Sequence, residues 1–245
     1  TKGVMEWCHM TPSHVTVPPT VVGNVAVVTE VTGDRWGVDE ITGQKLWHAV
    51  LDDDMPPKYA THFIHSPGLV KGSRVYYCYQ GGPFAVDARN GKLVWRGEPF
   101  AGYDAFTHSR GVIISDKLYC VGFLEGLVEY DIKTPNAVPS KLPFKWETSG
   151  DLVHDGLLWI LGRDKLIGYD LVARQATTLI QLSPFILPAD PVIRGGFAVV
   201  PYGNEGVAKY GLESGKRQWS YKCGPGPMVF ATNRHESSGI VGTPL

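Results

Sequence analysis

Residues 38–47 read VDEITGQKLW, and the phrase returns at residues 86–95 as VDARNGKLVW. A third copy at residues 210–219 reads YGLESGKRQW, and two divergent copies keep only a Tyr-Asp pair, at residues 130–131 and 169–170. The aspartate of the phrase, or the glycine in its place in the last copy, recurs after 48, 44, 39 and 41 residues. A repeat of this length, built from short strands and tight turns, is typical of a β-propeller in which each copy forms one blade.

Each copy divides into four short apolar segments separated by turns, which predicts a four-stranded blade. The second strand of successive copies is predicted at residues 75–79, 117–121, 157–161 and 197–201. We therefore expect an all-β fold of four-stranded antiparallel blades, with about six blades or a segment of a seven- or eight-bladed ring. Five copies are recognisable, partial blade strands are expected at residues 1–8 and 228–245, and residues 1–245 are expected to form a single propeller domain.

The repeated residues have structural explanations. An aspartate at the end of the third strand can accept backbone N–H groups within the following turn. Glycine supplies the positive φ that a tight hairpin needs, and a tryptophan in the fourth strand can cover the gap between neighbouring blades. These structural positions are Asp39, Asp87, Asp131 and Asp170, then Gly43, Gly91 and Gly215, then Trp47, Trp95 and Trp219.

Composition excludes several classes of protein. The 245 residues are 43% hydrophobic and 19% charged, which is normal for a folded core. The net charge of −1 leaves no basic field to gather nucleic acid, so no nucleic-acid partner is expected. No apolar run reaches the length of a transmembrane segment. The four cysteines form no CxxC pair and no CxxCH haem site, and Cys78 and Cys120 are expected to be buried free thiols.

Histidines gather where blades begin, and they are the strongest candidates for a ligand site. The segment FIHS at residues 63–66 matches FTHS at residues 106–109, and a looser match follows at residue 235. The first strand of each blade lines the central channel, so equivalent positions of different blades should converge there. The candidate ligand-binding residues are His62, His65, His108 and His235, with Arg110, Arg234, Tyr59 and Tyr103 beside them.

Three interpretations of this histidine group stay open. The rings can satisfy neighbouring backbone carbonyls, which their repetition in the sequence favours. They can bind a ligand, either a transition metal held by His65 and His108 or an acidic sugar. They can also abstract a proton beside a carboxylate, as polysaccharide lyases do, with a neighbouring tyrosine and arginine.

The pattern hydrophobic-Asp-x-x-[TN]-G-x-x-x-Trp resembles the tryptophan-docking repeat of pyrroloquinoline-quinone-like, or quinoprotein-type, propellers. That family contains alcohol and glucose dehydrogenases and also non-enzymatic, BamB-like members. The dehydrogenases use a vicinal Cys-Cys pair and carboxylate and amide ligands to calcium, and neither motif occurs in this chain. The resemblance therefore implies the propeller fold and places this chain closer to the non-enzymatic members than to the dehydrogenases. We accordingly expect no cofactor. Pyrroloquinoline quinone with calcium, or a transition metal, would belong to the enzymatic alternative.

These observations favour a non-catalytic binding or scaffolding propeller in the periplasm or outside the cell. Its loops and channel mouth would present a rigid surface to a protein or glycan partner, or an exposed blade edge would accept a partner strand. The loops expected to do so are residues 52–62 and the insertion at residues 133–141, KTPNAVPSK, which should protrude. The alternative is an enzyme acting on a sugar or alcohol at the channel mouth, either a quinoprotein dehydrogenase fragment or a polysaccharide lyase. Composition gives no oligomeric state.

Overall fold

Most of the chain is described by a computed structural model. Placed residues are 6–15, 17–30, 32–50, 67–78, 82–99, 111–122, 126–144, 151–161, 165–182, 191–202 and 206–222. Within these ranges there is no helix, and so none with the length and hydropathy to cross a membrane. The chain divides into two compact units, Thr1–Tyr119 with Glu129–Ser140 (unit 1) and Cys120–Val128 with Lys141–Leu245 (unit 2). That residues 1–245 form a single domain stays a prediction.

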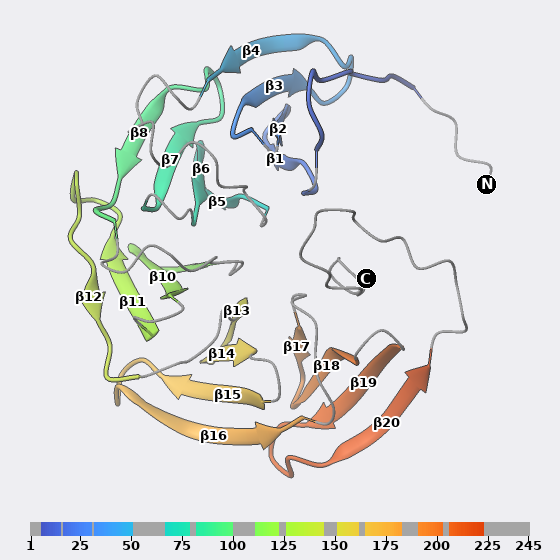
Figure 1. Ribbon diagram of the computed structural model, residues 1–245, viewed down its shortest axis with the longest axis vertical. Helices are drawn as coiled ribbons and strands as arrows, with labels where there is room; N and C mark the ends of the chain where they lie inside the picture. Colours follow the sequence, from blue (N-terminus) through green and yellow to red (C-terminus); the bar gives the residue numbers. More distant parts are fainter. Residues whose placement is uncertain are drawn as a thin grey trace. The chain divides into compact units, whose positions relative to one another are not determined.

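The strands form four-stranded sheets in which each strand pairs with the next along the chain (Figure 1). The described residues hold five such sheets, one for each copy of the repeat. The predicted all-β propeller fold with four-stranded antiparallel blades is confirmed. The second strands match their predictions to within a few residues, because the hydrophobic runs that identify them are continuous.

The strand bounds follow the repeat. The first two blades contain β1 (Thr20–Val22), β2 (Val25–Thr29), β3 (Arg35–Asp39) and β4 (Lys45–Ala49), then β5 (Leu69–Lys71), β6 (Arg74–Tyr77), β7 (Phe84–Asp87) and β8 (Leu93–Arg96). The third contains β9 (Val112–Ile114), β10 (Lys117–Gly122), β11 (Gly126–Asp131) and β12 (Ser140–Lys141). The last two contain β13 (Asp151–Asp155), β14 (Leu157–Leu161), β15 (Lys165–Asp170) and β16 (Gln175–Gln181), then β17 (Val192–Arg194), β18 (Phe197–Tyr202), β19 (Gly206–Gly211) and β20 (Arg217–Lys222).

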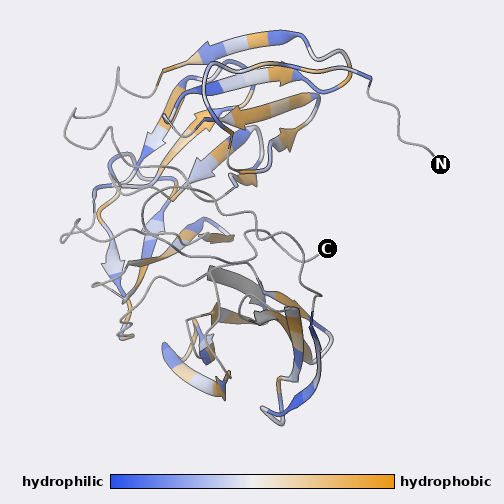
Figure 2. Ribbon diagram, turned by 45° about the vertical axis from the view of Figure 1, so that its right-hand side comes forward, coloured by the Kyte–Doolittle hydropathy of each residue, from blue (hydrophilic) through white to orange (hydrophobic). Residues whose placement is uncertain are grey.

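Central and outer strands differ in composition because they differ in burial. β2 reads VAVVT and β14 reads LLWIL, and nearly every residue of both is buried. Such continuous apolar runs are expected where both faces of a sheet are covered. Outer strands such as β8 expose most of their side chains. Figure 2 shows the hydrophobic segments, in orange, along the strands of both units.

The turn after the third strand is built by the repeated aspartate. The Asp39 carboxylate accepts the backbone N–H of Thr42 at 2.8 Å, and the Asp170 carboxylate accepts the N–H of Val172 at 2.8 Å. The glycine that follows has positive φ in the three best copies: 71° at Gly43, 73° at Gly91 and 63° at Gly215. The threonine-to-aspartate bonds hold the pKa of Asp39 below its usual value.

Tryptophans dock neighbouring copies together in unit 1. The Trp47 indole N–H donates to the carbonyl of Ala88 in the next blade at 2.8 Å, and its ring packs against Gly91. A Cβ added to Gly91 would lie 2.5 Å from that ring. Trp95 donates in the same way to the carbonyl of Thr134 at 2.8 Å. Each docked indole satisfies a main-chain carbonyl and also buries a large apolar ring.

The same docking continues upstream of the first blade. The Trp7 indole N–H donates to the carbonyl of Glu40 at 2.9 Å, and its ring packs over Gly43, where an added Cβ would lie 2.7 Å away. Trp7 therefore occupies the place on the first blade that Trp47 occupies on the second. That residues 1–8 form a partial blade strand stays a prediction, because residues 1–5 lie outside the described residues.

Unit 2 joins its blades differently. A cluster of buried side chains, with no docked tryptophan from an outer strand, lies between the fourth and fifth blades. Ile180 of β16 takes the place against Gly215, 3.9 Å from the position of an added Cβ. The members of this cluster are Trp159, Leu161, Leu166, Ile180, Leu182, Ile193, Ala198, Val200, Ala208 and Tyr210.

That Trp219 covers a gap between blades stays a prediction, because the residues that follow Lys222 and would form the next blade lie outside the described part of the chain. Its side chain is 44% exposed, compared with 9% for Trp47 and 5% for Trp95. The register also differs, because Trp47 lies opposite Gly37 whereas Trp219 lies opposite Lys209.

Candidate functional site

The insertion, residues 133–141, is held against the outer edge of the second blade. The Glu98 N–H donates to the carbonyl of Ala137 at 2.8 Å, and Gly97 and Ala137 form an isolated parallel bridge. Ala137 is 3% exposed. The prediction that this insertion protrudes is therefore wrong for its middle, because hydrogen bonds along the neighbouring blade edge tie the backbone down.

Two aromatic side chains support the insertion, Trp95 directly and Tyr130 through Glu98. Trp95 donates to the carbonyl of Thr134, and the hydroxyl of Tyr130 donates to the carbonyl of Glu98 at 2.9 Å. The two rings meet edge to face, with centroids 6.2 Å apart. The backbone of the insertion is thus fixed at two points while the side chain of Val138 is 76% exposed.

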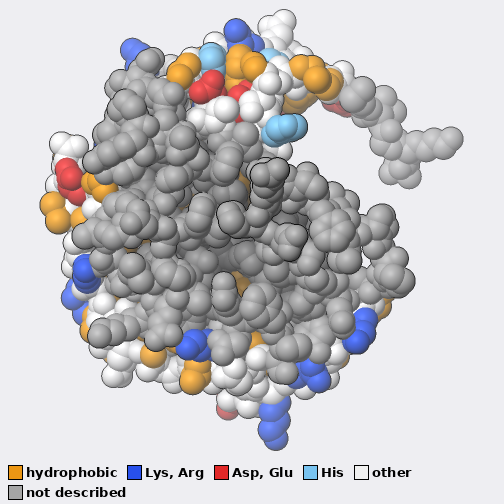
Figure 3. Space-filling view, viewed as in Figure 1, with side chains coloured by type: hydrophobic (Ala, Val, Ile, Leu, Met, Phe, Trp, Pro, Cys, Tyr) orange, Lys and Arg blue, Asp and Glu red, His pale blue; other side chains and the backbone are white. Residues whose placement is uncertain are grey.

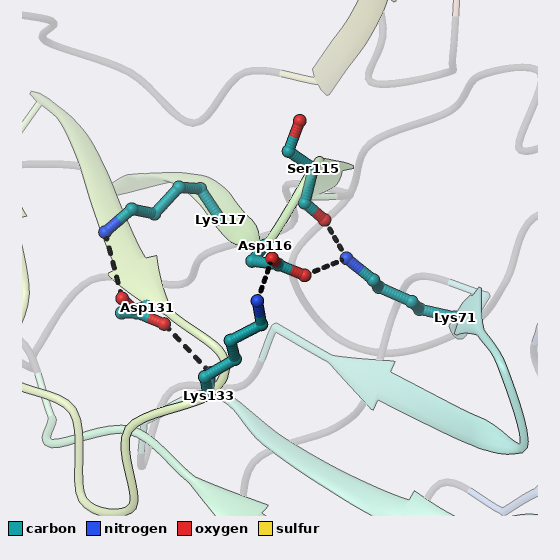
Figure 4. A network of polar contacts seen from close by, with 6 residues as sticks. All are labelled: Lys71, Ser115, Asp116, Lys117, Asp131 and Lys133. Atoms are coloured by element: carbon teal, nitrogen blue, oxygen red, sulfur yellow. Dashed lines mark hydrogen bonds and ion pairs between the residues drawn. The ribbon is translucent and has the colours of Figure 1, made fainter.

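A network of three lysines and two aspartates fixes the start of the insertion (Figure 4). Asp116, in the hairpin turn between β9 and β10, contacts Lys133 at 2.5 Å and Lys71 of the second blade at 2.6 Å. Lys71 also donates to the carbonyl of Ser115. Lys117 completes the set through Asp131 at 3.3 Å. We call these five charged side chains the lysine–aspartate network.

Charge in this network shifts the titration of its members. Lys133, and then Lys71, holds the pKa of Asp116 at about 2. The N–H of Lys133 and the ammonium of Lys117 lower the pKa of Asp131, and Asp116 raises the pKa of Lys133. Asp116, Asp131 and Lys133 therefore stay charged at neutral pH. The network therefore links the second and third blades on the side where the insertion begins, and its exposed position leaves it open to salt screening.

A second polar group lies on the first blade. The Trp36 ring stacks on His48, with centroids 3.9 Å apart, and its indole N–H donates to the Glu30 carboxylate at 2.8 Å. Glu30 is buried, and His48 lies 3.4 Å from Asp34. Figure 3 shows histidine side chains, in pale blue, in the region of the first blade and of the segment that precedes it. The sequence prediction missed this group because its members come from one blade and do not repeat.

Arg35 is a buried cation next to the second blade. Its guanidinium lies over the rings of Tyr77, at 5.0 Å, and Phe84, at 4.3 Å. The hydroxyl of Thr29 lies 3.2 Å from that of Tyr77, and burial raises the pKa of Tyr77. Cation–π contacts of this kind stabilise a desolvated guanidinium. The arrangement supports packing between the first and second blades.

The structure does not describe the predicted ligand-binding residues. His62, His65, His108, His235, Arg110, Arg234, Tyr59 and Tyr103 all lie outside the described residues, as does the loop at residues 52–62. The channel-mouth site stays a prediction. Within the described ranges, no group of three His, Cys, Asp or Glu side chains is placed to hold a metal ion.

Comparison with known proteins gives a family and a fold. The family model PQQ_2, described as outer membrane protein assembly factor BamB, matches residues 1–172. BamB from Moraxella catarrhalis is similar in structure, with a TM-score of 0.65 and 16% identity over 87% of this chain and 66% of that chain. The chain thus spans slightly less than two thirds of that protein. No curated protein matches the chain in sequence.

Two other solved structures share the fold. The computationally designed protein Ika8 has a TM-score of 0.64 and 14% identity, over 86% of this chain and 62% of that one. Quinohemoprotein alcohol dehydrogenase from Comamonas testosteroni has a TM-score of 0.60 and 15% identity, over 91% of this chain and 45% of that one. A designed protein and an enzyme on the same scaffold illustrate that fold alone does not decide function.

Proposed function

Because this chain belongs to the family of outer membrane protein assembly factor BamB, we propose that it is a non-catalytic scaffold that holds a protein partner during outer membrane protein assembly. The proposal places it in the periplasm and involves no cofactor. A scaffold that binds a glycan in place of a protein is one alternative. An enzyme with its active site at the predicted channel mouth is the other. Family membership over residues 1–172 supports the scaffold over both.

The insertion supplies the single observation that carries this proposal. An exposed apolar side chain, Val138, stands on a backbone fixed by Trp95, by the pairing at Ala137 and by the lysine–aspartate network. A binding loop whose conformation is set beforehand loses little conformational entropy on association. Val138 lies beside exposed Asn136 and Pro135, so the surface offers an apolar contact with polar groups at its margin.

Site-specific photocrosslinking in cells tests the proposal. A photoreactive amino acid at Val138 is expected to give one discrete protein adduct. The matched control is the same amino acid at Val172, which is 96% exposed in a turn of the fourth blade and is expected to give none. Because the photoreactive amino acid replaces Val138, the second change is made at a neighbouring residue of the insertion. Asn136→Lys in the chain that carries the probe is expected to weaken the adduct.

Three outcomes contradict the proposal. Equal adducts from Val138 and Val172 would mean that crosslinking at Val138 depends only on the exposure of the side chain and not on a specific partner. An adduct that carries sugar and no polypeptide means a glycan partner. The absence of any adduct at Val138, in a protein that is folded by circular dichroism, removes the insertion as a partner surface.

A further inference from the structure

The turn after the third strand of the second blade contains the one Asn-Gly pair of the sequence, Asn90–Gly91. The sequence has five asparagines, and only this one precedes a glycine. The equivalent residue is Thr42 in the first copy of the repeat and Ser214 in the last. Asparagine is a thermolabile residue, and it is most reactive before glycine, which has no side chain to shield its backbone nitrogen. One turn of the repeat thus carries a reactive pair that its equivalents do not.

The reaction of such a pair is deamidation. The backbone nitrogen of Gly91 attacks the side-chain Cγ of Asn90, and a succinimide ring closes. The carboxamide nitrogen leaves as ammonia, which carries away the proton of the Gly91 N–H. Water then opens the ring at either carbonyl and gives aspartate or isoaspartate, so water is the only co-reactant. The reaction requires that the turn rotates to bring the nitrogen and Cγ together.

In the folded turn both reacting groups are held by hydrogen bonds. The Gly91 N–H donates to the carbonyl of Asp87 at 2.8 Å, and the carboxamide oxygen of Asn90 accepts the N–H of Lys92 at 2.9 Å. Gly91 has a φ of 73°, which the tight turn requires. The side chain of Asn90 is exposed, so water reaches it freely. The protection of this pair therefore comes from fixed geometry and not from the exclusion of water.

The Trp47 ring of the first blade holds this geometry in place. A Cβ added to Gly91 would lie 2.5 Å from the ring, so the ring lies directly on the backbone that would have to move. The indole N–H also donates to the carbonyl of Ala88, in the same turn, at 2.8 Å. Gly91 is buried beneath the ring. Ring closure at Asn90 therefore requires a local opening in which Trp47 first leaves the turn.

We propose that Asn90 is a deamidation site that the docked Trp47 keeps unreactive, and that it reacts when the joint between the first and second blades opens. The isoaspartate product carries one extra carbon in the main chain between Ala88 and Gly91. Trp47 then no longer meets both residues at the spacing it fits, so one opening of the joint becomes permanent. The aspartate product keeps the main-chain length and an oxygen for the Lys92 N–H, so it leaves the turn intact.

Peptide mapping by mass spectrometry during incubation at mildly alkaline pH tests the proposal. It measures the rate of deamidation at Asn90 in the folded chain, in the chain unfolded in urea, and in variants. The folded wild type is expected to react at least about tenfold more slowly than the unfolded chain, because only molecules with an open joint react. Trp47→Ala is expected to raise the rate in buffer by about tenfold or more.

Trp95→Ala is the matched control. Trp95 is 5% exposed and docks on the carbonyl of Thr134 in the third blade, so its loss destabilises a different joint. The rate at Asn90 in this variant is expected to stay close to that of the wild type. Equal acceleration by the two variants would mean that the reaction follows global unfolding. That result overturns the proposal, as does an unchanged rate in Trp47→Ala or a folded wild type that reacts as fast as the unfolded chain.

Two further variants complete the test. Gly37→Ala displaces the Trp47 ring without removing it, and it replaces Trp47→Ala if circular dichroism shows that variant to be unfolded. It should also accelerate the reaction, and an unchanged rate again overturns the proposal. Asn90→Thr gives the second turn the residue of the first and removes the reactive group.

Denaturant titration after prolonged incubation tests the consequence of the reaction. Wild-type chain that has accumulated isoaspartate at position 90 is expected to have lost stability, whereas Asn90→Thr incubated in the same way is expected to keep it. Equal losses in the two chains would show that isoaspartate does not undo the joint.

Discussion

Trp47 in the first blade and Trp159 in the fourth cover equivalent glycines but reach them from different strands. Gly37 and Gly168 each stand two residues before the turn aspartate. Trp47 comes from the outer strand and gives its indole N–H to Ala88, whereas Trp159 comes from the second strand and its buried indole nitrogen has no hydrogen-bond partner among the described residues. The same apolar space can thus be filled with or without the polar contact that joins one blade to the next.

The register shows how the exchange works. Thr178 occupies the position of β16 that Trp47 occupies in β4, each opposite the glycine of its blade. The ring that would lie over Gly168 is supplied by Trp159, whose atoms come within 3.1 Å of an added Cβ. Because β14 is an inner neighbour of that glycine, its tryptophan packs in the buried cluster of unit 2 rather than against the turn of the next blade.

Removing whole side chains should give the largest effect. Trp47→Ala is expected to lower the free energy of unfolding by about 3–5 kcal/mol, because it removes a large buried ring and opens a cavity. Trp219→Ala, at a site that is 44% exposed, should cost about 1 kcal/mol or less. Denaturant titration of the two variants measures the difference. Equal losses would mean that Trp219 is docked as deeply as Trp47.

Adding one methyl group beneath the docked ring comes next. In Gly37→Ala the new Cβ would lie 2.1 Å from the Trp47 ring, so the ring must move. Overpacking of this kind is expected to cost about 1–3 kcal/mol. Gly168→Ala should cost less, because the nearest atoms lie 3.1 Å away. A Gly168 variant as unstable as the Gly37 variant would show that the two glycines are equally crowded.

Replacing tryptophan by phenylalanine removes the indole N–H but keeps an aromatic ring, so it measures what the polar contact contributes to stability. Trp47→Phe leaves the Ala88 carbonyl without its donor and is expected to lower the free energy of unfolding by about 1–3 kcal/mol, part of which is the smaller ring. Trp159→Phe removes a buried N–H that has no partner within the described part of the chain, so the loss from the smaller ring is offset and the change in the free energy of unfolding should be close to zero. Thermal denaturation of both variants gives the comparison. A larger loss of stability in Trp159→Phe than in Trp47→Phe would contradict the stabilising role of the Trp47 hydrogen bond.

Acid titration has the smallest expected effect and concerns the lysine–aspartate network of unit 1. The folded pKa of Asp116, about 2, lies below its usual value of 3.8, so the folded state binds its proton less readily than the unfolded state. The stabilisation is present above pH 3.8 and disappears as the pH falls through about 2. Asp116→Asn should therefore melt below the wild type at neutral pH and together with it near pH 2. A constant difference over that range would assign the effect to something other than ionisation.

The sequence predicted the blades well because its strongest signals are local. An aspartate that caps its own turn and a glycine with positive φ act within a few residues, so the phrase at residues 38–47 identifies them. The docking of Trp219 stays a prediction, because the residues after Lys222 lie outside the described part of the chain. The path of the insertion depends on pairing between Gly97 and Ala137, forty residues apart, and no repeat marks it. The channel histidines stay a prediction, because they lie outside the described residues.

The docked indoles bind to main-chain carbonyls, and this has a consequence for how the copies can change. The accepting residues in unit 1 are Glu40, Ala88 and Thr134, which share no side-chain chemistry. A mutation at any of them leaves the carbonyl in place, so neighbouring copies need not change together. Each copy can drift in its own sequence while the joint to the next one persists, and new surface residues such as those of the insertion can arise in one blade without disturbing the others.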